Sequence, residues 1–366
     1  MTGKLVIENL KHRPMRSLLS ILLIAVPVTL ILTLVGLTRG LSEDSQERTR
    51  GIGADIVVRG TNASSALSFS GSTLSQGFVK LLLAQPHVKL AMGVVTHPIE
   101  LPLSIQGIDL AELNAMSGGF TYVAGGPFRQ PDDVLIDTFY AAQKHARVGD
   151  SIELINRPWR VAGIVESGKL SHIFVEREEL QRLDSATGKL SQIYLKLDSP
   201  ANTSAVIAQL KQKLGEQYPI WSIAELTSMV SVNNVQGVKQ LLLVIIGVGV
   251  VIGFAVVCLS MYMAVLQRTR EIGILKSLGA SKTFILRMIV IEALLLGVGG
   301  TLLGILMSYG AWWIISTFVP ASLPMKIVYI WWPIAGLITL AGTALGALYP
   351  GFSAAHHDPI EALAYE

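Results

Sequence analysis

The sequence predicts an α-helical membrane protein with four transmembrane helices, one plus three, and an α+β extracytoplasmic domain between the first and second helices. Of its 366 residues, 51% are hydrophobic and 15% charged, whereas an ordinary soluble domain is about 25% charged. Four apolar runs are long enough to cross a hydrocarbon core, which needs about 20 helical residues; they cover residues 18–37, 241–266, 293–318 and 327–349. About 200 residues separate the first two runs, enough for a hydrophobic core.

The first apolar run follows several basic residues, as in a secretory signal. It is longer than the core of such a signal, which has about 7 to 15 residues, and no A-x-A-like cleavage site follows before Arg39. We therefore expect an uncleaved membrane anchor.

Basic residues in short flanks indicate which side of the membrane is cytoplasmic. They precede the first run and recur between the second and third; these are Lys4, Lys11, Arg13, Arg16, Arg268, Arg270, Lys276, Lys282 and Arg287. The loop between the third and fourth runs contains only Lys326. We expect both termini in the cytoplasm and the long segment outside.

Three pairs of glycines at a spacing of four predict close helix packing, within one subunit or in a dimer. The pairs are Gly249 and Gly253, Gly300 and Gly304, and Gly342 and Gly346. No run has a charge near its centre, which argues against an ion-coupled carrier. Glu292, near the start of the third run, is either a charge at a helix end or part of a helix contact.

Periodicity in the long segment predicts strands at residues 54–59, 172–176 and 192–197, and helices at 74–85 and 202–218. Residues 151–166 read as a hairpin that turns at Asn156-Arg157-Pro158. Residues 61–77 are rich in Ser, Ala and Gly and predict a loop.

Several function classes lack a signal in the sequence. A single cysteine excludes an intramolecular disulfide framework, and the net charge of +3 is too small to indicate nucleic-acid binding. The scattered histidines lack metal-ligand spacing, and no hydrolase motif occurs. We therefore expect a non-catalytic chain without a metal site, whose histidines are solvated or hydrogen-bonded.

Residues 267–282 predict a short amphipathic helix, because Ile272, Leu275, Leu278 and Gly279 fall on one helical face. Gly279 to Ser281 provide a helix stop and a cap for the next helix. Chemistry alone leaves two interpretations open: a turn that rests on lipid, or a helix that docks a cytoplasmic partner.

The same segment resembles the signature of the FtsX-like permeases of MacB-type ABC transporters. The similar motifs are RTREIGILKSLGAS at 268–281, EALLLG at 292–297, ENL at 8–10, RSLL at 16–19, GADIVV at 53–58, VGD at 148–150, WRVAGI at 159–164 and DPIEAL at 358–363. They occur in the family's order along nearly the whole chain.

The resemblance implies a permease subunit that works as a homodimer or with a paralogous permease, and whose connector is a coupling helix in a groove of the ATPase. The implied coupling residues are Arg270, Glu271, Ile272, Gly273, Leu275, Lys276, Leu278, Gly279, Ala280 and Ser281. The sequence contains no G-x-x-x-x-G-K-[ST] motif, so ATP and Mg²⁺ are expected in two copies of a separate ATPase subunit, unlike in MacB itself.

The resemblance also implies the organisation and use of the chain. We expect a cytoplasmic segment 1–17, TM1 at 18–38, a periplasmic domain at 39–239, TM2 at 240–266, the coupling helix at 267–284, TM3 at 285–318, a loop at 319–326, TM4 at 327–350 and a cytoplasmic tail at 351–366.

In a bacterial inner membrane, ATP hydrolysis would move the periplasmic domain through a stalk at residues 225–240. This motion would export or extract an amphiphilic substrate (drug, peptide, lipid or lipoprotein) by mechanotransmission, with a periplasmic adaptor and an outer-membrane channel as further partners. The alternative is a non-transporting regulator that activates a cell-wall hydrolase.

Overall fold

The computed structural model describes residues 14–61, 74–100, 103–229, 236–318 and 324–356. The chain divides into two units, a helical unit and an α+β domain. The motifs at 8–10 and 358–363, and most of the predicted loop at 61–77, lie outside the described residues.

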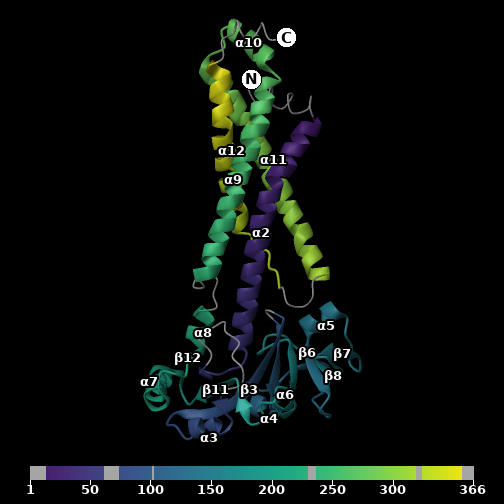
Figure 1. Ribbon diagram of the computed structural model, residues 1–366, viewed down its shortest axis with the longest axis vertical. Coiled ribbons are helices and arrows are strands. Elements are labelled where there is room, and N and C mark those ends of the chain that lie inside the picture. The colour runs from purple at the N-terminus through teal and green to yellow at the C-terminus, as the bar shows by residue number, and fades with distance from the viewer. Residues whose placement is uncertain (1–13, 62–73, 101–102, 230–235, 319–323, 357–366) are drawn as a thin grey trace. The chain divides into compact units, whose positions relative to one another are not determined.

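The helical unit contains four helices that are long and apolar enough to cross a membrane. They are α2 (Pro14–Arg50), α9 (Gln236–Leu266), α11 (Lys282–Phe318) and α12 (Trp331–His356). The short helix α10 (Thr269–Ser277) lies at the end of this bundle where α9 ends and α11 begins (Figure 1). Together with the α+β domain between α2 and α9, these helices confirm the predicted fold class.

Helix α2 is longer than the sequence indicates. Its 37 residues extend about 55 Å at 1.5 Å per residue, whereas a hydrocarbon core is about 30 Å thick. Its last turns, residues 40–50, belong to the α+β domain, so the helix does not end at the expected boundary near residue 39. The expected stalk at 225–240 contains a separate helix, α8 (Ile223–Met229), and the start of α9; residues 230–235 lie outside the described part.

The α+β domain is built on one mixed sheet of ten strands, in the order β12-β1-β11-β3-β4-β9-β6-β8-β5, with β7 paired to β8. Its strands are β1 (Ile56–Arg59), β3 (Val88–Glu100), β4 (Leu103–Ile108), β5 (Tyr122–Gly125), β6 (Asp133–Asp137), β7 (Ser151–Leu154), β8 (Arg157–Val165), β9 (Ile173–Glu176), β11 (Gln192–Leu197) and β12 (Ile220–Ser222). A separate small ladder joins β2 (Leu74–Ser75) to β10 (Lys189–Leu190).

The long strand β3 holds the two halves of the sheet together. Its residues 88–94 pair antiparallel with β11, and its residues 95–100 pair antiparallel with β4. Beyond β4 the sheet is mixed, because β4 runs parallel to β9 and β6 runs parallel to β8. A strand of 13 residues is needed for this double pairing.

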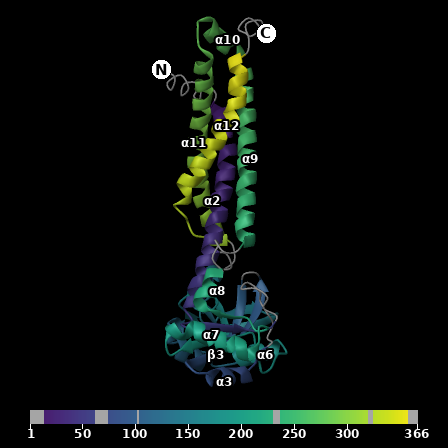
Figure 2. The same cartoon turned by 90° about the vertical axis from the view of Figure 1, so that its left-hand side faces the viewer.

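Both faces of the sheet are buried under helices. Ile56 and Val58 of β1 face one hydrophobic core and Val57 faces the other, because successive side chains of a strand point to opposite faces. The first core receives α3 (Gly77–Leu83), α5 (Thr138–Lys144), α6 (Arg177–Leu183) and α7 (Thr203–Leu214), and the second receives α4 (Leu110–Ser117) and α8. Figure 2 shows this domain from the side.

The hairpin of β7 and β8 forms, but its turn lies one residue earlier than expected. The turn residues are Ile155 and Asn156, both at φ +54°, and Leu154 pairs with Arg157. A two-residue hairpin turn of type I′ needs positive φ at both positions. Pro158 therefore lies inside β8, opposite Glu153, rather than in the turn.

Candidate functional site

Helix α10 is a short amphipathic helix whose ends are defined by its own residues. Glu271 in its first turn and Lys276 in its last turn match the polarity of the helix dipole. Gly279 has φ +95°, which lets the chain reverse after the helix, and the Ala280 amide donates to the Leu275 carbonyl at 2.9 Å. The Ser281 hydroxyl accepts a hydrogen bond from the Phe284 amide at 3.2 Å and so caps α11.

The apolar residues of α10 point to two different faces. Ile272 is 6% exposed and packs, with Leu275, in the core of the helical unit. Ile274 and Leu278 are 45% and 79% exposed and lie four residues apart, which places them on one helical face. The expectation that Ile272, Leu275, Leu278 and Gly279 share a face is therefore wrong for Leu278 and Gly279. Leu278 lies one turn after the exposed Ile274, to which its amide is hydrogen-bonded, and Gly279 is exposed as well.

Both ends of α10 are tied to the helical unit. Arg268, which precedes α10, donates from Nη1 to Glu292 Oε2 of α11 at 3.2 Å, and both side chains are buried. At the other end the Lys276 ammonium donates to the Ala355 carbonyl of α12 at 2.9 Å. Glu292 thus takes part in a helix contact, one of the two roles that the sequence left open.

The remaining predicted coupling residues have different surroundings. Glu271 is exposed, Gly273 is buried in α10, and Ala280 is half-buried against the helical unit. Arg270 lies in α10, and its side chain is outside the described part of the structure. The exposed residues at α10 include Glu271 and Ile274 of the helix and Leu278, which directly follows it; we call these three residues the α10 ridge.

The predicted packing glycines differ in what they contact. A Cβ added at Gly300 would lie 2.4 Å from Ile24 Cγ2, and one added at Gly304 would lie 2.7 Å from Val28 Cβ, so α11 packs directly on α2 at both positions. At Gly346 the added Cβ would lie 2.9 Å from the Phe254 carbonyl oxygen of α9. Gly249 makes only ordinary contacts with α2. A Cβ at Gly253 or Gly342 would meet no atom within 4 Å in the described residues.

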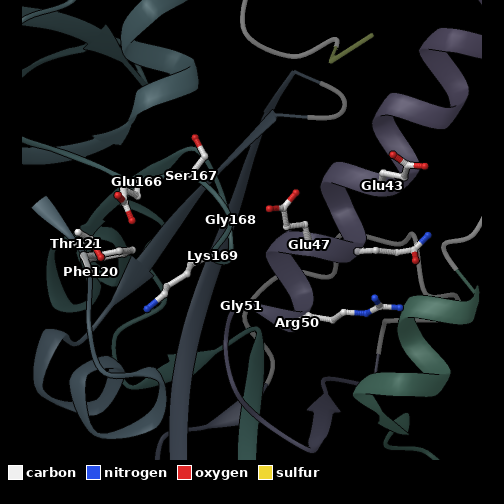
Figure 3. Close-up of a pocket in the computed structure, with 11 residues that line it drawn as sticks. Glu43, Glu47, Arg50, Gly51, Phe120, Thr121, Glu166, Ser167, Gly168 and Lys169 are labelled. Atoms are coloured by element: carbon white, nitrogen blue, oxygen red, sulfur yellow. The ribbon is translucent and has the colours of Figure 1, made fainter. Parts of the chain in front are cut away.

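A pocket of about 540 Å³ lies in the α+β domain beside the last turns of α2 (Figure 3). One wall carries Glu43, Glu47 and Arg50 of α2, and the other is the connection between β8 and β9, residues 166–169. The Lys169 ammonium donates to the Ser117 carbonyl at 3.1 Å and to the Gly119 carbonyl. The pocket is therefore lined by both signs of charge, the carboxylates of Glu43, Glu47 and Glu166 and the cations Arg50 and Lys169.

The same connection holds the end of α2 through three contacts. A Cβ added at Gly51 would lie 1.8 Å from the Gly168 carbonyl oxygen, and the Leu170 amide donates to the Arg48 carbonyl at 3.0 Å. His172 follows, 4% exposed at its side chain, with Nε2 at 3.7 Å from Asp44 Oδ2. We call these residues the α2 junction: Asp44, Arg48, Gly51, Gly168, Leu170 and His172.

Three histidines of the α+β domain make side-chain hydrogen bonds to carboxylates, and the fourth, His145, is exposed. His172 Nδ1 lies 2.6 Å from Asp137 Oδ2, His97 Nδ1 lies 2.7 Å from Asp184 Oδ1, and His87 bonds Asp198 at 2.8 Å. Within the described ranges, no group of three or more His, Cys, Asp or Glu side chains is arranged to hold a metal ion.

The α2 junction was not predicted, although the sequence carries a signal for it. Residues 41–50 contain no glycine or proline and place Asp44 four residues before Arg48, a spacing that stabilises a helix. Continuing the first helix through this polar stretch would have extended it to Arg50. The partner His172 is 128 residues away, and only the folded sheet brings it to Asp44.

Two family models match the chain. The MacB-like periplasmic core domain matches residues 17–213, more than half of the chain, and the FtsX-like permease C-terminal model matches residues 243–359. The chain belongs to the MacB-like family of FtsX-like permeases. This confirms the resemblance that the motifs indicate, and α10 lies within the FtsX-like region.

Relatives of this MacB-like permease include transporter proteins from several bacteria. The macrolide export ATP-binding/permease protein MacB of Rhodopirellula baltica is 34% identical over 188 residues, covering 49% of this chain and 27% of the relative. MacB of Acinetobacter baylyi is 25% identical over 391 residues, covering 97% and 58% respectively. The ABC transporter permease YknZ of Bacillus subtilis is 28% identical over 228 residues, covering 60% and 55%.

The permease spans less than two thirds of the length of these relatives. Among solved structures, the periplasmic region of MacB from Actinobacillus actinomycetemcomitans matches 50% of this chain and 94% of that chain. The TM-score of that match is 0.36 and the sequence identity is 16%.

Proposed function

We propose that this chain is the non-catalytic permease subunit of an ABC transporter. In this proposal a separate ATPase, with ATP and Mg²⁺, docks on α10, and its closure moves the α+β domain in the periplasm. The motion exports or extracts an amphiphilic substrate by mechanotransmission.

The α10 ridge is the observation that carries this proposal. An exposed apolar pair at positions 274 and 278 with Glu271 beside it has the form of a helix that docks in a groove. Because Arg268 and Lys276 tie the two ends of α10 to α11 and α12, a displacement of α10 would displace those helices. A helix that merely rested on lipid would not need these ties.

The basic residues around α10 support a cytoplasmic position for this end of the bundle. We propose that the chain lies in the bacterial inner membrane with both termini cytoplasmic. Two copies of the permease, or one copy with a paralogous permease, would bind two copies of the ATPase. Gly253 and Gly342 line a small pocket between α2, α9 and α12 of the same chain, and Gly342 is buried there, so these two glycines do not mark the contact between copies.

Export is favoured over the alternative of regulating a cell-wall hydrolase. Two of the relatives described above are named for macrolide export, and macrolides fall within the proposed class of amphiphilic substrates. A periplasmic adaptor and an outer-membrane channel would complete the export path. Genes for such partners beside that of the permease would support export, and a hydrolase gene there would support regulation.

The docking proposal is tested by Leu278→Asp and Ile274→Asp. A charge on the ridge must lose its hydration on docking, which disfavours binding, so we expect both variants to lose co-purification with the ATPase and ATP-dependent transport. Leu81→Asp, a change at a residue that is 46% exposed in α3, is the matched control and retains both. Wild-type co-purification and transport in both ridge variants would refute docking through α10.

A further inference from the structure

His172 occupies a position between two carboxylates from different elements. Asp137, at the end of β6, faces Nδ1 at 2.6 Å, and Asp44 of α2 faces Nε2 at 3.7 Å. A neutral imidazole has one N–H and presents a lone pair on its other nitrogen, whereas the imidazolium has an N–H on each. Only the protonated ring therefore presents a donor to both carboxylates.

His172 is the charged group that links α2 to β6, because Asp44 and Asp137 both face its ring. Asp137 is already fixed, because its Oδ1 accepts from the Tyr140 amide at 2.8 Å and its own amide donates to the His172 carbonyl at 3.0 Å. Asp44 Oδ2 lies 2.5 Å from the Arg48 guanidinium of the same helix. Across the junction, the charge on the ring is what attracts the side chain of Asp44.

We infer that protonated His172 is the positioning residue that fixes the end of α2 to the β6–β9 part of the sheet, and that its deprotonation loosens this attachment. The inference deepens the proposed function and rests on it for its role, because motion of the first membrane helix would reach the sheet through this contact. Loosening would also widen the neighbouring pocket, whose walls are α2 and residues 166–169.

The groups that face the ring determine the direction of the pH dependence. They are Asp44 and Arg48 from α2, Asp137 from β6 and the ring of Phe139 from α5, which lies 5.1 Å from the imidazole centroid. Burial lowers the pKa of His172, but the hydrogen bond to Asp137 and the nearby Asp44 carboxylate outweigh burial and the opposing charge of Arg48, so the pKa is raised above its ordinary value of 6.5.

A raised pKa means that folding favours the protonated ring. The attachment is therefore fully present below about pH 6.5 and is lost as the pH rises through the raised value. Above that value the Nε2 lone pair faces Asp44, and the helix end keeps its contacts at Gly51 and Arg48 and the buried Ile52 that follows it.

The test is amide hydrogen exchange of residues 40–50 in the purified full-length permease without ATPase, corrected for the intrinsic rate. Between about pH 5.5 and about pH 9 we expect protection in the wild type to fall several-fold as His172 titrates. His172→Gln and Asp44→Asn are expected to give low protection with no such transition. His97→Gln is the matched control and is expected to keep the wild-type profile. His97 of β3 also pairs with a carboxylate, that of Asp184, which directly follows α6.

A second measurement distinguishes an electrostatic contact between His172 and Asp44 from uncharged packing of the His172 ring. Nuclear magnetic resonance titration of the His172 ring is expected to give a midpoint above 6.5 that falls in Asp44→Asn. A flat wild-type exchange profile, or a midpoint unchanged by Asp44→Asn, overturns the inference. Neither measurement involves the ATPase, so this outcome is independent of whether the ridge variants retain docking.

Discussion

Arg268 and Glu292 form a buried ion pair that joins the start of α10 to α11, with Nη1 and Oε2 at 3.2 Å. The two residues are 24 positions apart, and the pair closes the turn through which the chain passes from α9 to α11. Both side chains are buried, and a buried charge without a partner is costly. The guanidinium has several donors and the carboxylate has two acceptor oxygens, so each group can satisfy the other.

Replacing one member of this pair is expected to destabilise the helical unit. Glu292→Gln leaves the Arg268 charge buried, which costs about 3 to 5 kcal/mol when a buried pair is broken. The thermal unfolding midpoint in detergent should fall, whereas Arg287→Gln, at an exposed position of α11, should leave it unchanged. Equal midpoints for Glu292→Gln and the wild type would mean that the pair does not hold the connector.

Ile272 is expected to differ from Leu278 because it faces the bundle. Ile272→Ala should lower the unfolding free energy by about 2 to 4 kcal/mol, as for other buried large-to-small changes. Leu278→Ala, at a residue that is 79% exposed, should leave stability unchanged and weaken ATPase binding. The two variants are compared by thermal unfolding and by co-purification, and equal destabilisation by both would contradict the assigned faces of α10.

Close packing of α11 on α2 predicts a strong effect at Gly300. Gly300→Ala places a Cβ 2.7 Å from Ile24 Cβ, an atom next to the backbone that cannot move aside by rotamer change. We expect a loss of about 1 to 3 kcal/mol, measured as a lower unfolding midpoint. Gly310→Ala in the same helix meets no atom within 4 Å in the described residues and is the control; a loss of the same size there would contradict the packing argument.

Gly51 is expected to be essential for the α2 junction. In Gly51→Ala the added Cβ would lie 1.8 Å from the Gly168 carbonyl oxygen, so the backbone of one segment must move. We expect loss of exchange protection in residues 40–50 at every pH, which distinguishes this change from titration of His172. Gly126→Ala, where nothing lies within 4 Å among the described residues, should keep wild-type protection.

Asp133 is expected to make the α+β domain sensitive to acid. Burial raises the pKa of its carboxyl, but hydrogen bonds from the Arg129 amide, the Arg160 side chain and the Gln130 amide outweigh burial, so the pKa lies below its ordinary value of 3.8. The stabilisation is present above that value and is lost as the pH falls through the lowered pKa.

The measurement for Asp133 is the urea unfolding midpoint between about pH 7 and about pH 3. The wild type should lose stability toward the acid end, and Asp133→Asn should show a smaller loss over the same range. An Asp133→Asn profile parallel to that of the wild type would show that other carboxyl groups cause the acid sensitivity.

The sequence predicted those helices and strands whose residue pattern is visible within one short segment. Runs of apolar residues identified the four helices that are long and apolar enough to cross a membrane, and alternation identified β1, β9, β11 and the β7–β8 hairpin. Strands β4 and β6 and helices α4 to α6 were not predicted, and their burial depends on partners far along the chain. Leu278 was assigned to the wrong face of α10, because it was grouped with the buried Ile272, whereas it lies one turn after the exposed Ile274.

Hydrophobicity, basic flanks and a contiguous motif are properties of short segments, so the chain alone was enough to predict four helices able to cross a membrane, their one-plus-three order and the resemblance to the family. The pairing of Arg268 with Glu292, of Gly300 with Ile24 and of His172 with Asp44 required the folded protein. Each of these contacts joins residues that are distant in the sequence, and their distances depend on how helices and strands pack, which no single segment contains.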